Sequence, residues 1–87
     1  MNNITFHIRG WEDYLYWQEQ DRKTLKKLNK LILNIERSPY EGVGKPEPLQ
    51  YEWQGYWSRR IDEKNRLIYR IVDSRIEIAQ CRSHYDE

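Results

Sequence analysis

The sequence contains few of the residues that build disulfide frameworks, metal sites or membrane spans. Its single cysteine, Cys81, cannot form an internal disulfide, and its two histidines lack carboxylates at metal-ligand spacing. No apolar run approaches the roughly 20 residues needed to cross a bilayer, and the N-terminus lacks the basic and apolar regions of a secretory signal. We therefore expect a cytoplasmic protein that has no membrane contact and no metal or other cofactor. The length of 87 residues predicts one domain over residues 1–87.

Signatures of several enzyme classes are also missing. Gly42 and Gly44 form too short a motif for a dinucleotide-binding or P-loop fingerprint. Cys81 and His84 are too close in sequence for a catalytic cysteine–histidine pair and lack a nucleophile-elbow context. We therefore expect neither of these nucleotide-binding folds nor a thiol enzyme.

The net charge is only +1, but the charges are unevenly distributed. Residues 22–37 contain six basic side chains and one acidic one, and residues 59–82 contain seven basic and four acidic ones. Phosphate binding depends on the local density of lysine and arginine rather than on net charge. Both stretches are therefore candidates for phosphate contact. The alternative is a solvated helix face together with ordinary surface arginines.

The first half of the chain predicts a strand followed by two helices. Alternating apolar residues from Ile4 to Ile8 have the period of a half-buried strand, and from Trp11 to Gln20 the spacing becomes helical. The side of this first helix expected to be buried carries Trp11, Tyr14 and Leu15. A second helix is expected between Asp21, a suitable N-cap, and Ser38-Pro39, where proline disfavours helical geometry in the preceding residue. Its apolar stripe comprises Leu25, Leu28, Leu31, Ile32 and Ile35.

The second half predicts a loop and three strands. Residues 40–50 contain two glycines and two prolines, so they are expected to form a loop. The strands are expected at Trp57 to Ile61, Arg66 to Val72 and Ile76 to Arg82. Their connections have the length of hairpin turns. Together with the first half, this order predicts an α+β domain with an N-terminal strand, two helices and then an antiparallel sheet.

Three groups of side chains in the second half could carry chemistry. Glu47 lies between two prolines, in a stiff segment that can hold a carboxylate at a fixed angle. The expected strands carry arginines whose planar forks suit phosphate, with Arg59 and Arg60 on opposite faces. His84 can transfer a proton near neutral pH, and Tyr85 offers a ring for base stacking. Each group also has a simpler interpretation. Glu47 could be an ordinary charged loop residue, the arginines could lie at the edge of the sheet, and His84-Tyr85 could have no function.

Five segments taken together resemble the YoeB/Txe toxins of the RelE superfamily. They run across nearly the whole chain in the order and spacing of that family. The segments are Trp11 to Gln18, Gly44 to Leu49, Trp57 to Ile61, Asn65 to Tyr69, and His84-Tyr85. The resemblance implies a RelE-like, microbial-ribonuclease-like fold and a role as the toxin of a type II toxin–antitoxin system. It also implies an antitoxin of the YefM/Axe type, a possible homodimer, and metal-independent cleavage of mRNA in the A site of the 70S ribosome.

The resemblance assigns a role to each candidate site residue. Glu47 is expected as the general base, Arg66 as the phosphate-stabilising group, His84 as the general acid and Tyr85 as a substrate-positioning residue. Supporting contacts to phosphate or ribosomal RNA are expected from Lys45, Arg59, Arg60 and Arg82.

The sequence departs from the usual family pattern in two places. Asp86 and Glu87 follow His84-Tyr85, and residues 50–54 replace a version rich in lysine or histidine.

Two other functions remain as alternatives. ParE-like proteins of the same superfamily keep the fold and bind gyrase without a nuclease site, although they are not expected to retain the full set of catalytic candidates. An inactive module that only binds its antitoxin is the second alternative.

Overall fold

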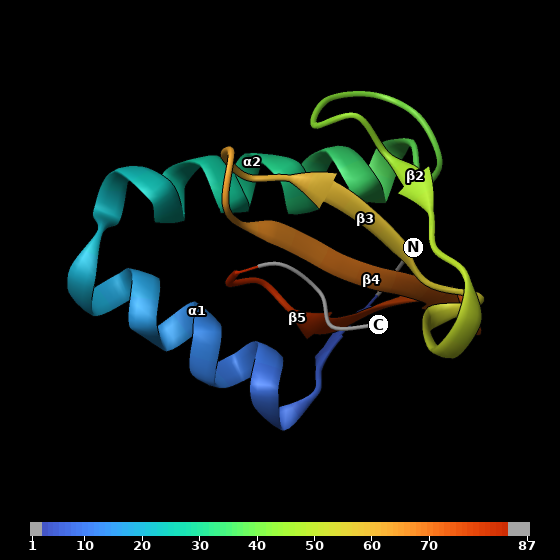
Figure 1. Ribbon diagram of the computed structural model, residues 1–87, viewed down its shortest axis with the longest axis horizontal. Helices are drawn as coiled ribbons and strands as arrows, with labels where there is room; N and C mark the ends of the chain where they lie inside the picture. The colour runs from blue at the N-terminus through green and yellow to red at the C-terminus, as the bar shows by residue number, and fades with distance from the viewer. Residues whose placement is uncertain (1–2, 84–87) are drawn as a thin grey trace.

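A five-stranded sheet in the order β1-β5-β4-β3-β2 forms the frame of the protein in this computed structural model, which describes residues 3–83 (Figure 1). Only the pairing of β1 with β5 is parallel, and the other three strand pairs are antiparallel. The predicted α+β class and element order are therefore confirmed. The elements are β1 (Asn3–Phe6), α1 (Ile8–Gln20), α2 (Arg22–Arg37), β2 (Glu47–Pro48), the short 3₁₀ helix η1 (Tyr51–Trp53), β3 (Trp57–Arg60), β4 (Arg66–Val72) and β5 (Arg75–Gln80).

The second helix, α2, forms as its sequence pattern predicts. The Asp21 carboxylate accepts a hydrogen bond from the backbone N–H of Thr24 at 3.1 Å and another from the Thr24 hydroxyl at 2.8 Å. These bonds lower the pKa of Asp21 and satisfy one of the free N–H groups at the helix start. The apolar stripe packs into the core, with Leu28, Leu31, Ile32 and Ile35 buried.

The first helix, α1, begins earlier than expected, and of its predicted apolar side only Tyr14 packs against the core. Trp11 and Leu15 were expected to face inward, but they are 45% and 38% exposed. The buried residues are Gly10, Asp13 and Trp17. Gly10 lets the helix approach β5 closely, because a Cβ there would lie 2.6 Å from the backbone carbonyl oxygen of Ile78. The prediction failed because hydrophobic periodicity does not anticipate a buried carboxylate.

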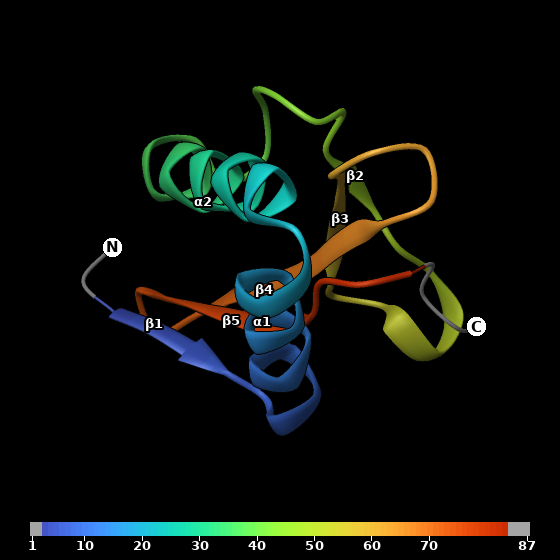
Figure 2. The same cartoon turned by 90° about the vertical axis from the view of Figure 1, so that its left-hand side faces the viewer.

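The sheet has two unlike faces. Both helices pack on one face, where they enclose the main core (Figure 2). Leu67 and Tyr69 of β4 point into this core, whereas Ile68 points to the other face. There it packs with Leu49 and Ala79 in a smaller cluster. We call this second face, which carries Leu49, Ile68 and Ala79, the open face.

The segment around Glu47 was expected to be a loop, but part of it forms the edge strand β2. Glu47 pairs with Ser58 and Pro48 pairs with Trp57. Proline is tolerated at a sheet edge because its missing N–H is not needed for pairing on the outer side. Flanking backbone hydrogen bonds hold the strand at both ends, from Arg60 N to Gly44 O at 2.7 Å and from Leu49 N to Tyr56 O at 2.9 Å. Glu47 is therefore attached to a rigid sheet.

Candidate functional site

The strand register places Glu47, Arg60 and Arg66 on the open face. Glu47 pairs with Ser58 and Ser58 pairs with Ile68, while Arg60 pairs with Arg66. Residues directly opposite one another share a face, and so do alternate residues of one strand. With strands about 4.8 Å apart and a rise of about 3.3 Å per residue, the Cα atoms of Glu47 and Arg66 are roughly 12 Å apart. Two side chains at that separation can contact the same ligand.

The Arg66 guanidinium is held along one edge by the hairpin between β3 and β4. Its Nη1 donates to the carbonyl oxygens of Asp62 at 2.8 Å, Glu63 at 3.2 Å and Asn65 at 3.2 Å. Among residues 3–83, no acceptor binds its Nε or Nη2, so three of its N–H groups have no partner within that part of the chain. The side chain is largely buried, since the residue is 8% exposed. A guanidinium fixed in this way is suited to an anion, because little reorganisation is needed when the anion binds.

Lys45 and Arg60 are exposed and lie beside a basic groove. The groove has a volume of about 760 Å³ and separates α2 from the segment leading into β2. Six cationic residues line this basic groove: Lys23, Lys26, Lys27, Lys30, Lys45 and Arg60. Within the described part of the chain, none of the six forms an ion pair. Within residues 3–83, no direct ion pair therefore compensates the positive charge of the groove.

Arg59 was expected to contact RNA, but the structure places it in the interior. It is fully buried, on the helix-facing side of β3. All five of its N–H groups have protein acceptors. Nε donates to the Tyr69 hydroxyl, Nη1 to Asn34 Oδ1 and the carbonyl of Val43, and Nη2 to the carbonyls of Ser38 and Glu41. Arg59 therefore holds the end of α2 and the following loop against the sheet, and its assignment as an RNA contact is wrong.

Arg82 lies against α1 rather than on the open face. Its guanidinium carbon is 3.5 Å from the centroid of the Tyr16 ring, close enough for a cation–π contact. The structure therefore does not bring Arg82 together with Glu47 and Arg66. The other two site candidates, His84 and Tyr85, lie outside the described residues.

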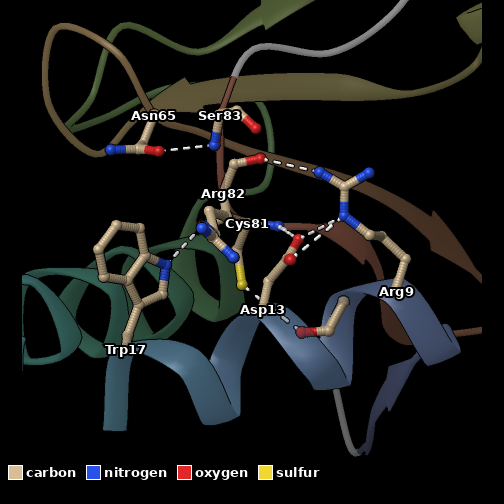
Figure 3. A network of polar contacts seen from close by, with 8 residues as sticks. Arg9, Asp13, Trp17, Asn65, Cys81, Arg82 and Ser83 are labelled. Carbon is tan, nitrogen blue, oxygen red and sulfur yellow. Dashed lines mark hydrogen bonds and ion pairs between the residues drawn. The ribbon is translucent and has the colours of Figure 1, made fainter. Parts of the chain in front are cut away.

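A network of polar contacts holds the last described residues, 81–83, between α1 and the β3–β4 hairpin (Figure 3). It uses Arg9, Asp13 and Trp17 of α1 together with Asn65 of the hairpin. The prediction of the site from sequence missed these residues. The spacing of Arg9 and Asp13 was a usable signal, since opposite charges four residues apart on a helix can pair.

A second charged cluster lies on the open face around Glu77. The Glu77 carboxylate accepts from Arg70 Nε at 2.7 Å and from Arg75 Nη2 at 2.8 Å, and it lies 3.4 Å from the His7 ring nitrogen. The two arginines lower the pKa of Glu77 to about 2. The Arg70 guanidinium also lies 4.9 Å from the centroid of the Tyr56 ring. Because its charges pair internally, this cluster braces β4 against β5.

Within residues 3–83, no group of three or more histidine, cysteine, aspartate or glutamate side chains could hold a metal ion. Neither of the two helices there is long and apolar enough to cross a membrane.

Comparison with known protein families gives a match over most of the chain. A family model described as the YoeB-like toxin of bacterial type II toxin–antitoxin systems matches residues 6–85. The toxin YoeB of Streptomyces coelicolor is 55% identical over 82 residues, which cover 94% of this chain and 98% of the relative. The toxin YoeB of Escherichia coli K12 is 55% identical over 76 residues, which cover 87% and 90%.

Solved structures of similar sequence have the same fold. The YoeB/ParE toxin from Agrobacterium tumefaciens has a TM-score of 0.93 and 45% identity, covering 95% of this chain and 99% of that one. A chain of the YoeB–YefM complex from Staphylococcus aureus has a TM-score of 0.90 and 46% identity, covering 95% and 97%. A YoeB dimer from the same organism has a TM-score of 0.89 and 48% identity, covering 95% of this chain and 97% of that one.

Proposed function

The chain belongs to the YoeB-like toxins of bacterial type II toxin–antitoxin systems, and from this premise we propose that it is an endoribonuclease that cuts mRNA in the ribosomal A site. One observation carries the proposal. Glu47 and Arg66 share the open face, and the backbone N–H of Arg66 donates to the carbonyl of Ser83 at 3.2 Å. The chain therefore arrives beside Arg66 one residue before His84.

These groups suit a reaction in which RNA supplies its own nucleophile. Glu47 accepts the proton of a ribose 2′-hydroxyl, and the 2′-oxygen attacks the adjacent phosphorus. The free N–H groups of Arg66 stabilise the negative charge that builds on the non-bridging oxygens, where loss of one donor typically costs about 10²–10³-fold in rate. His84 donates a proton to the departing 5′-oxygen. The products are a 2′,3′-cyclic phosphate and a 5′-hydroxyl, and addition of a water molecule to the cyclic ester then gives a 3′-phosphate.

The ribosome is part of this proposal because the base is weak. A carboxylate has little affinity for protons at neutral pH, and Glu47 is exposed on its edge strand. General base catalysis is worth only about 10²–10⁴-fold. Holding the 2′-oxygen in line with the scissile bond can supply several further kcal/mol of barrier reduction. A message oriented in the A site provides that alignment, so free RNA should be a poor substrate.

The same proposal includes the binding partners. Lys45 and Arg60 contact phosphates of the message or of ribosomal RNA, since both are exposed cations of the basic groove, and Arg60 is also the strand partner of Arg66. The antitoxin is of the YefM type, because a solved relative is a YoeB–YefM complex. A homodimer is proposed because a YoeB dimer has been solved. The site of action is the cytoplasm, where translation takes place.

The test is to map cut sites in a purified translation system, with one message that is translated and one that lacks a start site. The wild-type protein should cut only the translated message. Glu47→Gln and His84→Ala should each slow cutting by about 10²-fold or more. The control is Glu36→Gln, which alters an exposed carboxylate on α2. Equal cutting of both messages would contradict ribosome dependence. No cutting, combined with inhibition of gyrase supercoiling, would favour the ParE-like alternative.

A further inference from the structure

The chain leaving β5 is held by side chains of α1 instead of by a neighbouring strand (Figure 3). The backbone N–H of Cys81 donates to Asp13 Oδ2 at 3.0 Å, and the Cys81 carbonyl accepts from Trp17 Nε1 at 2.8 Å. One residue further on, the carbonyl of Arg82 accepts from Arg9 Nη2 at 3.2 Å. Three side chains at consecutive turns of one helix thus fix two successive residues of the chain.

Asp13 is the centre of this arrangement. It is 4% exposed, and its carboxylate also accepts from Arg9 Nε at 3.2 and 3.0 Å. Burying a carboxylate is costly even when it is paired, and an apolar residue at the same helix position generally costs less. Asp13 binds the backbone of the segment that leaves β5. Its burial is therefore explained better by a role in placing that segment than by a gain in stability.

The hairpin between β3 and β4 holds the other side of the same segment. The backbone N–H of Ser83 donates to Asn65 Oδ1 at 2.6 Å, and the Ser83 carbonyl accepts from Arg66 N at 3.2 Å. Asn65 is itself fixed by two hydrogen bonds at 3.0 Å from its Nδ2 to the Asp62 carboxylate. Ser83 has a φ of 59°, so the chain turns sharply at this point in a conformation uncommon for residues other than glycine.

We propose that Asp13 is a positioning residue for the ribonuclease site: by fixing residues 81–83 beside the Arg66 backbone, it sets the point from which the chain continues to His84. This inference rests on the proposed function. The carbonyl of Ser83 accepts a hydrogen bond from the backbone of Arg66. The Cα atom of the next residue in the chain follows only 3.8 Å from that of Ser83. The direction in which the chain leaves Ser83 therefore governs how the proposed general acid meets the leaving oxygen. Asp13 itself has no contact with RNA in this scheme.

A double-mutant cycle tests the inference, with single-turnover cutting measured on ribosomes stalled at one codon. Asp13→Asn should slow the plateau rate by about 100-fold, the effect expected of a misplacement near 1 Å, and leave the half-saturating toxin concentration unchanged. Arg9→Met should act in the same direction, because it removes the ion pair with Asp13 and the hydrogen bond to the Arg82 carbonyl. In a His84→Ala background neither substitution should slow cutting further, because residues acting through one group are not additive.

Tyr14→Phe is the matched control. It removes a 2.8 Å hydrogen bond from α1 to Asn29, so it weakens the same helix without touching residues 81–83. All rates are taken below the unfolding temperature of each variant. The inference is overturned if Asp13→Asn slows cutting by the same factor with and without His84, or if Tyr14→Phe slows it as much. Failure of the wild type to cut, or equal rates for wild type and His84→Ala, instead overturns the proposed function and the inference with it.

Discussion

Replacing Arg59 by lysine keeps the positive charge and tests whether this residue serves the fold or a ligand. All five guanidinium N–H groups donate to protein acceptors, and three of those acceptors are carbonyls between Ser38 and Val43. Lysine has three N–H groups, so at least two acceptors lose their donor. An unsatisfied buried polar group costs about 1–3 kcal/mol, which gives a loss of roughly 2–6 kcal/mol of folding free energy.

The assay is thermal unfolding followed by far-UV circular dichroism. A loss of 1 kcal/mol lowers the Tm of a domain of this size by roughly 4–8 °C, so Arg59→Lys should lower it by at least about 8 °C. Arg60→Lys is the matched control. Arg60 is adjacent to Arg59 but exposed, so this substitution should change the Tm by no more than a few degrees. All variants carry His84→Ala, so that toxicity of the active protein does not limit expression.

The two arginines should also separate in function. Arg60→Ala should weaken binding to ribosomes while leaving the Tm nearly unchanged. The reasoning fails if Arg59→Lys unfolds within about 2 °C of its parent. That result would mean that the buried hydrogen bonds of Arg59 contribute nothing to folding stability, contrary to the structural role inferred for it.

Three further predictions concern the fold and the basic groove. Gly10→Ala should lose about 1–3 kcal/mol of stability in urea unfolding, because its Cβ would lie 2.6 Å from the Ile78 carbonyl oxygen; a gain, as expected for an ordinary helix position, would contradict the close packing of α1 on β5. Glu77→Gln should lose about 1–2 kcal/mol at neutral pH, after allowance for the partial exposure of its arginine partners. Because the folded pKa of about 2 lies below the ordinary value of 4.5, the stability that Glu77 contributes is present above pH 4.5 and lost as the pH falls towards 2; a Tm difference from wild type that stays constant over this range would refute the pairing. Lys27→Glu combined with Lys30→Glu should weaken ribosome binding and reduce its dependence on salt concentration in a sedimentation assay, whereas Arg37→Glu, outside the basic groove, should do so far less.

Hydrophobic periodicity was sufficient for α2, because this helix buries one regular apolar stripe. It failed for α1, whose buried side contains Gly10 and Asp13 in place of large apolar residues. Those two residues are explained only by contacts with β5 and with Cys81, which lie about seventy residues away in sequence. No local pattern contains that information.

The arginines show the same limit within the candidate site. Strand alternation correctly predicted that Arg59 and Arg60 face opposite sides of β3, but it could not tell which of them is buried. That depends on the carbonyl groups that α2 and its following loop present above the sheet. The shared face of Glu47 and Arg66 likewise depends on the register of β2 with β3, in a segment that its prolines made look like a loop.

The central claim is that the message itself supplies the attacking oxygen. The most direct test is a ribosome-bound message with a single 2′-deoxy nucleotide at the mapped cut site, compared with the all-ribose message under the same conditions. The account predicts that cutting at that bond disappears, while the ribose message yields a downstream fragment with a 5′-hydroxyl. Cutting of the deoxy message at an undiminished rate, or a 5′-phosphate on the fragment, would contradict it.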